Sequence, residues 1–149
     1  MFRLNRNNRS FSSGFTVHFH RNTQIGRVHL NILTLVLAHQ GIGFPLLWCV
    51  LCKAGNSDTP ERITRLERFV AVFGKEQIAL VCADREFASA GLLAWLVKRE
   101  IGYRLRIKAN TLLANRKGQP TSARRFFQNC GLQQERSLSD RRRCGGQPV

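Results

Sequence analysis

A carboxylate at the end of an apolar run is the residue best placed for chemistry in this chain. The stretch IALVCADREF ends its apolar part at residue 83, and Asp84 follows directly. Ligands of α/β proteins often bind beyond the carboxyl ends of strands, and a carboxylate there suits Mg²⁺, which prefers oxygen ligands. Two-metal phosphoryl transfer needs several converging carboxylates, however. Taken alone, Asp84 therefore fits a turn or a helix cap better than a metal site.

Cysteine and histidine pairs are the other candidate ligands. Cys49 and Cys52 form a C-x-x-C in a predicted strand, where residues three apart point to opposite faces, so we expect buried thiols instead of a zinc site. His18 and His20 share one face of another predicted strand. Imidazole suits a softer metal than Mg²⁺. We interpret both histidines first as ordinary core or surface residues.

The charge of the chain favours a polyanionic partner. Lys and Arg number 24 against 9 Asp and Glu, a net charge of +15. Residues 1–31 contribute +5, residues 32–110 contribute +4 and residues 111–149 contribute +6. Nucleic acid is the simplest partner for such a chain, and a charged, solvated surface is the alternative.

The chain has 5 cysteines, an odd number, and their spacing does not resemble that of a disulfide framework. This argues against a secreted disulfide scaffold.

Apolar periodicity predicts the elements that position these residues. Strands are expected at 15–20, 28–38, 44–52, 78–83 and 103–108. One helix is expected to begin with Thr59 as its N-cap and Pro60 in its first turn, and to end at Gly74. A second helix is centred on 92–97 and ends before Gly102. The order β-β-β-α-β-α-β predicts an α/β fold, a mixed sheet with flanking helices.

This pattern divides the chain into a basic N-terminal arm (1–14), a globular core (15–110) and a basic tail (111–149). We expect the tail to be disordered and not to pack on the core, apart from a short helix near 124–129.

The apolar stretch Leu30 to Cys52 is long enough for a membrane span, but turn residues around Gly41 and Pro45 divide it into two strands. The N-terminus lacks the apolar segment of a secretory signal. We therefore expect no membrane association and a cytoplasmic location.

The last strand has two chemically distinct faces. The sequence YRLRIK alternates strictly, so its apolar and basic side chains point to opposite sides of a sheet. The apolar face carries Tyr103, Leu105 and Ile107, and the basic face carries Arg104, Arg106 and Lys108.

Two stretches, NILTLVLAHQGIGFPLLWCVLCKAGNSDTPERI and VCADREFASAGLLAWLVKREIGYRLRIKAN, resemble the DDE transposases of bacterial insertion sequences, in the insertion-sequence 4 family. The likeness covers Arg27 to Asn110. It implies a ribonuclease-H-like core that cuts and rejoins DNA during transposition and recombination, with Mg²⁺ held by two Asp and one Glu. It also implies that Asp84 is the second catalytic aspartate and a metal ligand. The same resemblance places the basic face of Arg104, Arg106 and Lys108 near DNA, whereas a solvated edge strand is the alternative.

Two departures from the family pattern argue against catalysis. No acidic residue precedes Asp58, and His20 stands roughly where the first aspartate belongs. The Tyr-Arg-Glu-Lys motif of the catalytic Glu is absent, and Glu135 has no tyrosine before it. We therefore expect an incomplete, truncated or degraded fragment with defective catalysis, in which Mg²⁺ binding is a family expectation that the missing carboxylates oppose.

Three interpretations remain open. The first is a defective DDE-type transposase that binds DNA and lies with the bacterial nucleoid. The second is a non-enzymatic DNA-binding remnant that forms homo-oligomers or mixes with a full-length related transposase. The third is a non-functional fragment.

Overall fold

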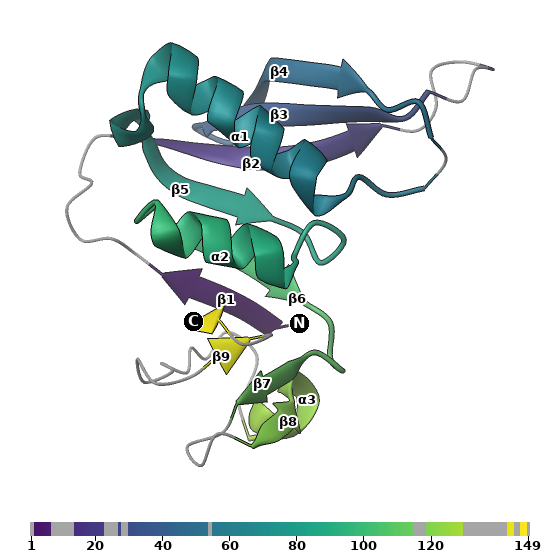
Figure 1. Cartoon of the computed structure of the whole chain (residues 1–149), viewed down its shortest axis with the longest axis vertical. Coiled ribbons are helices and arrows are strands. Elements are labelled where there is room, and N and C mark those ends of the chain that lie inside the picture. Colours follow the sequence, from purple (N-terminus) through teal and green to yellow (C-terminus); the bar gives the residue numbers. More distant parts are fainter. Residues whose placement is uncertain are drawn as a thin grey trace.

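A six-stranded mixed sheet forms the centre of the fold (Figure 1). The computed structural model describes residues 2–6, 14–22, 27, 30–53, 55–114, 119–129, 143–144 and 147–148. The sheet consists of β1 (Phe2–Arg6), β2 (Phe15–Asn22), β3 (Ile32–His39), β4 (Ile42–Val50), β5 (Ile78–Ala83) and β6 (Tyr103–Ile107). Its helices are α1 (Thr59–Phe73) and α2 (Ala90–Lys98), with a short 3-10 turn, η1 (Lys75–Gln77), between α1 and β5.

The order across the sheet is β1-β6-β5-β2-β3-β4. β2, β3 and β4 form an antiparallel meander, β5 lies parallel to β2, and β6 lies parallel to β5. The predicted α/β class, the mixed sheet and the β-β-β-α-β-α-β order from β2 to β6 are therefore confirmed. β1 was not predicted: it pairs antiparallel with β6, with Leu4 opposite Leu105.

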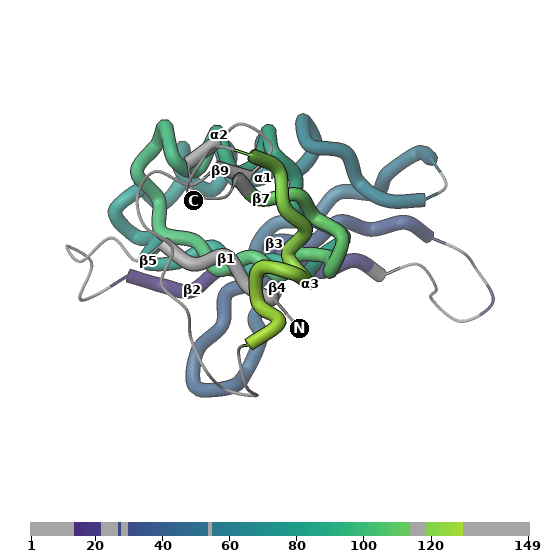
Figure 2. The backbone as a smooth tube through the Cα atoms, turned by 90° about the horizontal axis from the view of Figure 1, so that it is seen from below, coloured from purple at the N-terminus to yellow at the C-terminus, as the bar shows by residue number. Residues whose placement is uncertain are grey.

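Both long helices cover the same face of the sheet (Figures 1 and 2). Inward side chains from the central strands meet them, and Val17, Leu35, Val81 and Leu105 are all at most 1% exposed. The alternate residues of these strands point to the opposite face, where none of the described side chains from β2 to β6 is fully buried. We call this second surface the open face of the sheet.

Helix α1 begins one residue earlier than the sequence predicted. Asp58 is the N-cap instead of Thr59, because its carboxylate accepts a hydrogen bond from the Glu61 amide at 2.9 Å. The Glu61 side chain accepts in return from the Asp58 amide at 2.7 Å, which completes a capping box. Pro60 lies in the first turn and Gly74 ends the helix, as predicted.

A small second sheet corrects the prediction for the C-terminal segment. It consists of β7 (Leu112–Ala114), β8 (Pro120–Ser122), β9 (Arg143–Cys144) and β10 (Gln147–Pro148), and α3 (Ala123–Phe126) follows β8. Leu113 and Ala123 are fully buried in the core cluster, and Phe126 and Phe127 pack against it, so this part of the segment does contact the core. Strands of two or three residues are too short to show a period, which explains the wrong prediction. Glu135 lies outside the described residues.

The cysteine pair also differs from the prediction. β4 ends at Val50, so Cys52 lies beyond the strand and is exposed, while Cys49 is partly buried. The expectation of two buried thiols was therefore wrong for Cys52. The stretch 30–52 forms β3 and β4, and the described part of the chain contains no helix long and apolar enough to cross a membrane.

Candidate functional site

Asp84 lies where the sequence placed it, in a tight turn directly after β5. Its Oδ1 accepts from the Arg85 amide at 2.7 Å, and its carbonyl oxygen accepts from the Phe87 amide at 2.9 Å. The side chain remains 47% exposed, and the guanidinium Nη1 of Arg106 lies 3.5 Å from its Oδ2. Asp84 therefore shapes a turn and pairs with a cation from the neighbouring strand.

The donor set around Asp84 does not fit a two-metal centre. The nearest acidic neighbour in sequence, Glu86, pairs with Arg21 at 3.2 Å, so both carboxylates of this turn face arginines. Within the described ranges, no three His, Cys, Asp or Glu residues are grouped so that they could hold a metal ion. Mg²⁺ usually takes one or two carboxylates plus water and substrate phosphates, and phosphoryl transfer requires more than one converging carboxylate. No step through Mg²⁺ is derived from these residues.

Strand register brings His20 toward Asp84. β2 and β5 are parallel with Val17 opposite Val81 and His18 opposite Cys82, so two further residues along each strand lead to His20 and Asp84. A histidine at this position is a poor substitute for a carboxylate on Mg²⁺. β2 thus carries a histidine two residues before its end, and an ion-paired aspartate follows the end of β5.

A cavity of about 890 Å³ opens beside the same turn. Its polar wall includes Asp84, Glu86 and Ser89, the N-cap residue of α2, and its basic wall includes Arg85 and Lys108. The cavity floor is apolar and formed by Leu93, Leu105 and Ile107. Charges of both signs line this space, so it offers no uniformly anionic metal site.

The predicted basic face is present on β6. Arg104 and Arg106 alternate with the buried Tyr103, Leu105 and Ile107, and both arginines are partly exposed on the open face. Lys108 follows the end of β6 and is exposed. The alternation predicted from YRLRIK is confirmed for the strand itself.

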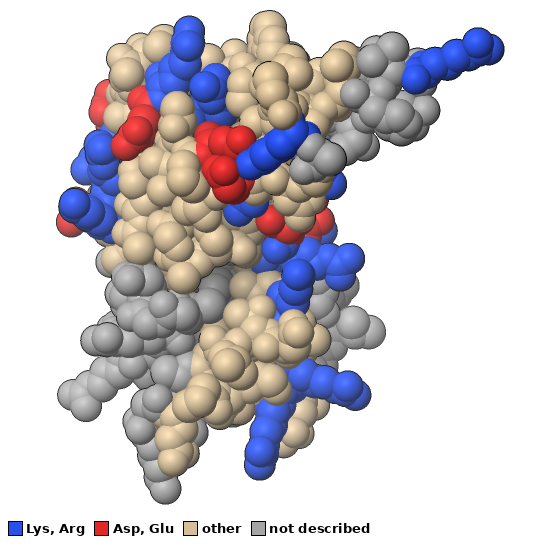
Figure 3. Space-filling view, turned by 45° about the vertical axis from the view of Figure 1, so that its right-hand side comes forward, with Lys and Arg blue, Asp and Glu red and all other residues tan. Residues whose placement is uncertain are grey.

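Helix α3 adds two arginines that the sequence did not single out. The Ala123 amide donates to the Thr111 carbonyl at 2.8 Å, and the Arg124 amide donates to the Ala109 carbonyl at the same distance. These bonds fix the start of α3 on the turn that follows β6, where Arg124 and Arg125 are exposed. In Figure 3, Lys and Arg side chains (blue) also lie on the lower half of the molecule, below the Asp and Glu side chains (red). We call Arg104, Arg106, Lys108, Arg124 and Arg125 the basic surface.

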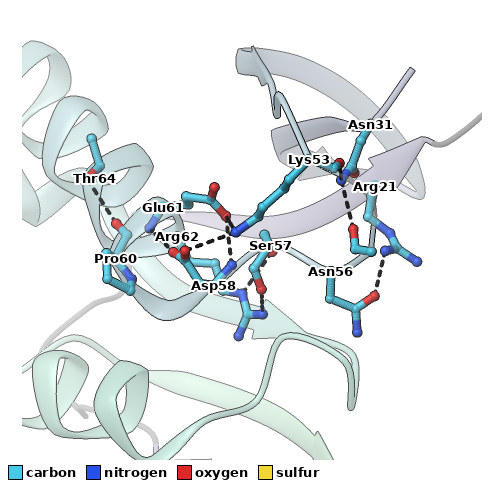
Figure 4. A network of polar contacts seen from close by, with 11 residues as sticks. Arg21, Asn31, Lys53, Asn56, Ser57, Asp58, Pro60, Glu61, Arg62 and Thr64 are labelled. Carbon is cyan, nitrogen blue, oxygen red and sulfur yellow. Dashed lines mark hydrogen bonds and ion pairs between the residues drawn. The ribbon is translucent and has the colours of Figure 1, made fainter. Parts of the chain in front are cut away.

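Arg62 of α1 joins the loop before α1 to the turn after β5, and Figure 4 shows its contacts with Ser57. Only 5% of this residue is exposed. Its Nε donates to the Ser57 hydroxyl at 2.9 Å, its Nη2 donates to the Ser57 carbonyl, and its Nη1 donates to the Phe87 carbonyl at 2.7 Å. Arg21 extends the same network from β2 by donating to the Asn56 side chain. Sequence reasoning missed Arg62 because an arginine among apolar helix positions gives no signal of its own burial.

His18 predicts a pH dependence of stability. Partial burial on the open face lowers the pKa of its imidazole below 6.5, so the unfolded chain binds the proton first as the pH falls. The free energy of unfolding is therefore expected to decrease as the pH falls from above 6.5 through the lower pKa of the folded state. His18→Gln should flatten this dependence in urea titrations between pH 7 and pH 5. A variant whose stability falls as steeply as that of the parent would contradict this role.

Comparison with known proteins gives no match: neither a family model, nor a curated protein, nor a solved structure resembles this chain significantly.

Proposed function

We propose that this protein binds nucleic acid, DNA in the first place, through the basic surface of β6 and α3. One observation carries the proposal: backbone hydrogen bonds fix the start of α3 on the turn after β6, so basic residues from both elements lie in one region of a chain with a net charge of +15. Arg and Lys that contact phosphates supply most non-specific affinity for DNA. The test is equilibrium binding to a labelled duplex, with affinity expected to fall linearly with salt on logarithmic scales.

We further propose a ribonuclease-H-like core of transposase origin. Two features support this origin: the element order from β2 to β6, and the position of Asp84 at the carboxyl end of a central parallel strand. DNA transposition by metal-dependent phosphoryl transfer would be the ancestral activity. The ion pair between Asp84 and Arg106 argues against that activity in this chain, because a guanidinium faces the carboxylate that the metal would need. Interference with a full-length relative, by occupying its DNA, is the proposed consequence.

Replacing Asp84 with asparagine separates binding from catalysis. The change removes a negative charge 3.5 Å from Arg106 and keeps the side chain nearly the same size. We expect duplex DNA to bind Asp84→Asn slightly more tightly than the parent, by about two- to fivefold at low salt, because Arg106 then meets phosphate without a competing carboxylate. Fluorescence anisotropy measures this change.

The same pair of proteins tests for catalysis. Incubation of supercoiled-circle and linear duplex substrates with Mg²⁺ or Mn²⁺ is expected to give no cleavage or joining with either protein. Metal-dependent nicking by the parent that disappears in Asp84→Asn would overturn the assignment of a binding protein and restore Asp84 as a catalytic residue.

A further inference from the structure

The open face of the sheet carries side chains in rows that cross five strands. Strand pairing connects Cys82 with both His18 and Arg104, so one row runs from β6 through β5 into β2. Next to it, His20 pairs with Thr34 and Thr34 with Trp48, which carries the row to the edge of the sheet at β4. None of these side chains is fully buried. These two adjacent rows together form a continuous accessible strip opposite the helices.

Charge is concentrated at one end of this strip. Arg104 and Arg106 stand on β6, and Arg106 retains 41% exposure of its side chain while it pairs with Asp84. The strand at the other end, β4, contains no charged residue. A ligand that follows the strip thus meets cations at β6, one of them paired with the Asp84 carboxylate, and uncharged groups beyond β2.

An aromatic ring lies at the uncharged end. Trp48 is 63% exposed, a large value for the largest apolar side chain. Its neighbours Leu47 and Cys49 pack against the core, so the indole stands on the opposite, open side. His20, also exposed, lies in the same row two strands away. Exposed rings combined with nearby cations are the usual means by which proteins hold unpaired bases and their phosphates.

We propose that the open face binds single-stranded nucleic acid, with a base stacked on Trp48 and phosphates held by Arg104 and Arg106. This inference rests on the proposed function and adds an unpaired strand as the form of nucleic acid that the open face binds. From β6 to β4 the strip crosses four inter-strand spacings of about 4.8 Å, roughly 19 Å in total, which accommodates a few nucleotides. A duplex presents no free base face to the indole and gains nothing from it.

The two tryptophans of the chain provide matched probes. Trp48 is on the open face, whereas Trp95 belongs to α2 on the helix-covered face, where its indole donates to Glu67 and lies against the Arg99 guanidinium. In Trp95→Phe only Trp48 emits, and we expect an unlabelled dT oligonucleotide of about 12 nucleotides to quench that emission by at least a third. In Trp48→Phe only Trp95 emits, and its emission should be unchanged at the same oligonucleotide concentration.

Affinity gives a second readout. Trp48→Ala is expected to weaken anisotropy-detected binding of labelled dT about tenfold, in line with the usual contribution of one stacked base, and to leave duplex affinity within twofold. The exposure of Trp48 means that folding should survive, which circular dichroism verifies.

Three outcomes overturn the inference. In the first, labelled dT binds without changing the Trp48 emission, and Trp48→Ala binds it as tightly as the parent. This result would leave the proposed function intact and place the bound strand elsewhere on the protein. A change in Trp48 emission that follows protein concentration without nucleic acid would assign the strip to a second copy of this chain. Absence of binding to both dT and duplex would reject the proposed function as well.

Discussion

Replacing Arg62 with methionine is expected to lower the free energy of unfolding by about 2–4 kcal/mol, the largest loss of stability among the substitutions considered. Arg62 is buried, and its guanidinium donates to the carbonyl oxygens of Ser57 and Phe87. Methionine preserves much of the volume but leaves both buried carbonyls without these donors. Chemical denaturation with guanidinium chloride, followed by circular dichroism, measures the difference.

The buried charge of Arg62 makes the stability of the fold more sensitive to a substitution at this position. Burial lowers the pKa of its guanidinium, and the carboxylates of Asp58, Glu61 and Glu86 oppose that shift, so the side chain is held charged inside the protein. Arg68→Met changes an exposed arginine of the same helix and serves as the control, with an expected effect within about 0.5 kcal/mol. Equal stabilities of the two variants would show that the buried hydrogen bonds do not hold the loops together.

Removing the positive charges of β6 and of the residue after it is expected to have the largest effect on DNA binding. Arg104, Arg106 and Lys108 changed together to glutamine should weaken duplex binding on the order of 100-fold at 0.1 M salt, because each lost phosphate contact removes the release of about one counterion. The loss should be similar on unrelated DNA sequences, since phosphate contacts carry no sequence information. The apolar side of β6 is unchanged, so the fold should be preserved. Anisotropy titrations on two unrelated duplexes measure both effects.

Long apolar or strictly alternating stretches could be predicted from the sequence. β5 begins and ends at the predicted residues, because an uninterrupted apolar run between polar residues leaves a single choice of strand. β6 was predicted with its faces because alternation fixes which side chains enter the core. Asp84 could be placed for the same reason, as the first polar residue after β5.

Features that depend on distant partners could not be predicted. The start of α1 moved to Asp58 because a reciprocal bond with Glu61 outweighs the intrinsic suitability of Thr59 as a cap. Among the described strands, β1 pairs only with β6, and the apolar–polar alternation of FRLNR spans only Phe2 to Asn5, too short a stretch to predict a strand. The position of Arg124 on the turn after β6 results from a backbone hydrogen bond to Ala109, which no local pattern encodes.

The relation between His20 and Asp84 shows the same limit. Their alignment at the ends of β2 and β5 follows from a parallel pairing between strands that are more than fifty residues apart in the sequence. An aspartate is expected from the sequence roughly at His20, but only the parallel pairing of β2 with β5 brings this part of β2 toward the end of β5. The arginine that pairs with Asp84 comes from a third strand and was predicted only as a DNA contact.

The salt dependence of duplex binding tests the central claim most directly. Association constants are measured by anisotropy from 50 to 300 mM NaCl for the parent, for Arg104, Arg106 and Lys108 changed to glutamine, and for a control with Arg68, Lys75 and Lys98 changed to glutamine. Both variants lose three positive charges, but the control residues lie on α1, the 3-10 turn and α2. The account predicts a linear log–log plot whose slope is shallower by about 2.7 in the β6 variant, and an unchanged slope in the control. Equal slopes in all three proteins would contradict binding through this surface, and a parent that binds neither duplex nor single-stranded DNA at 50 mM NaCl would contradict nucleic-acid binding altogether.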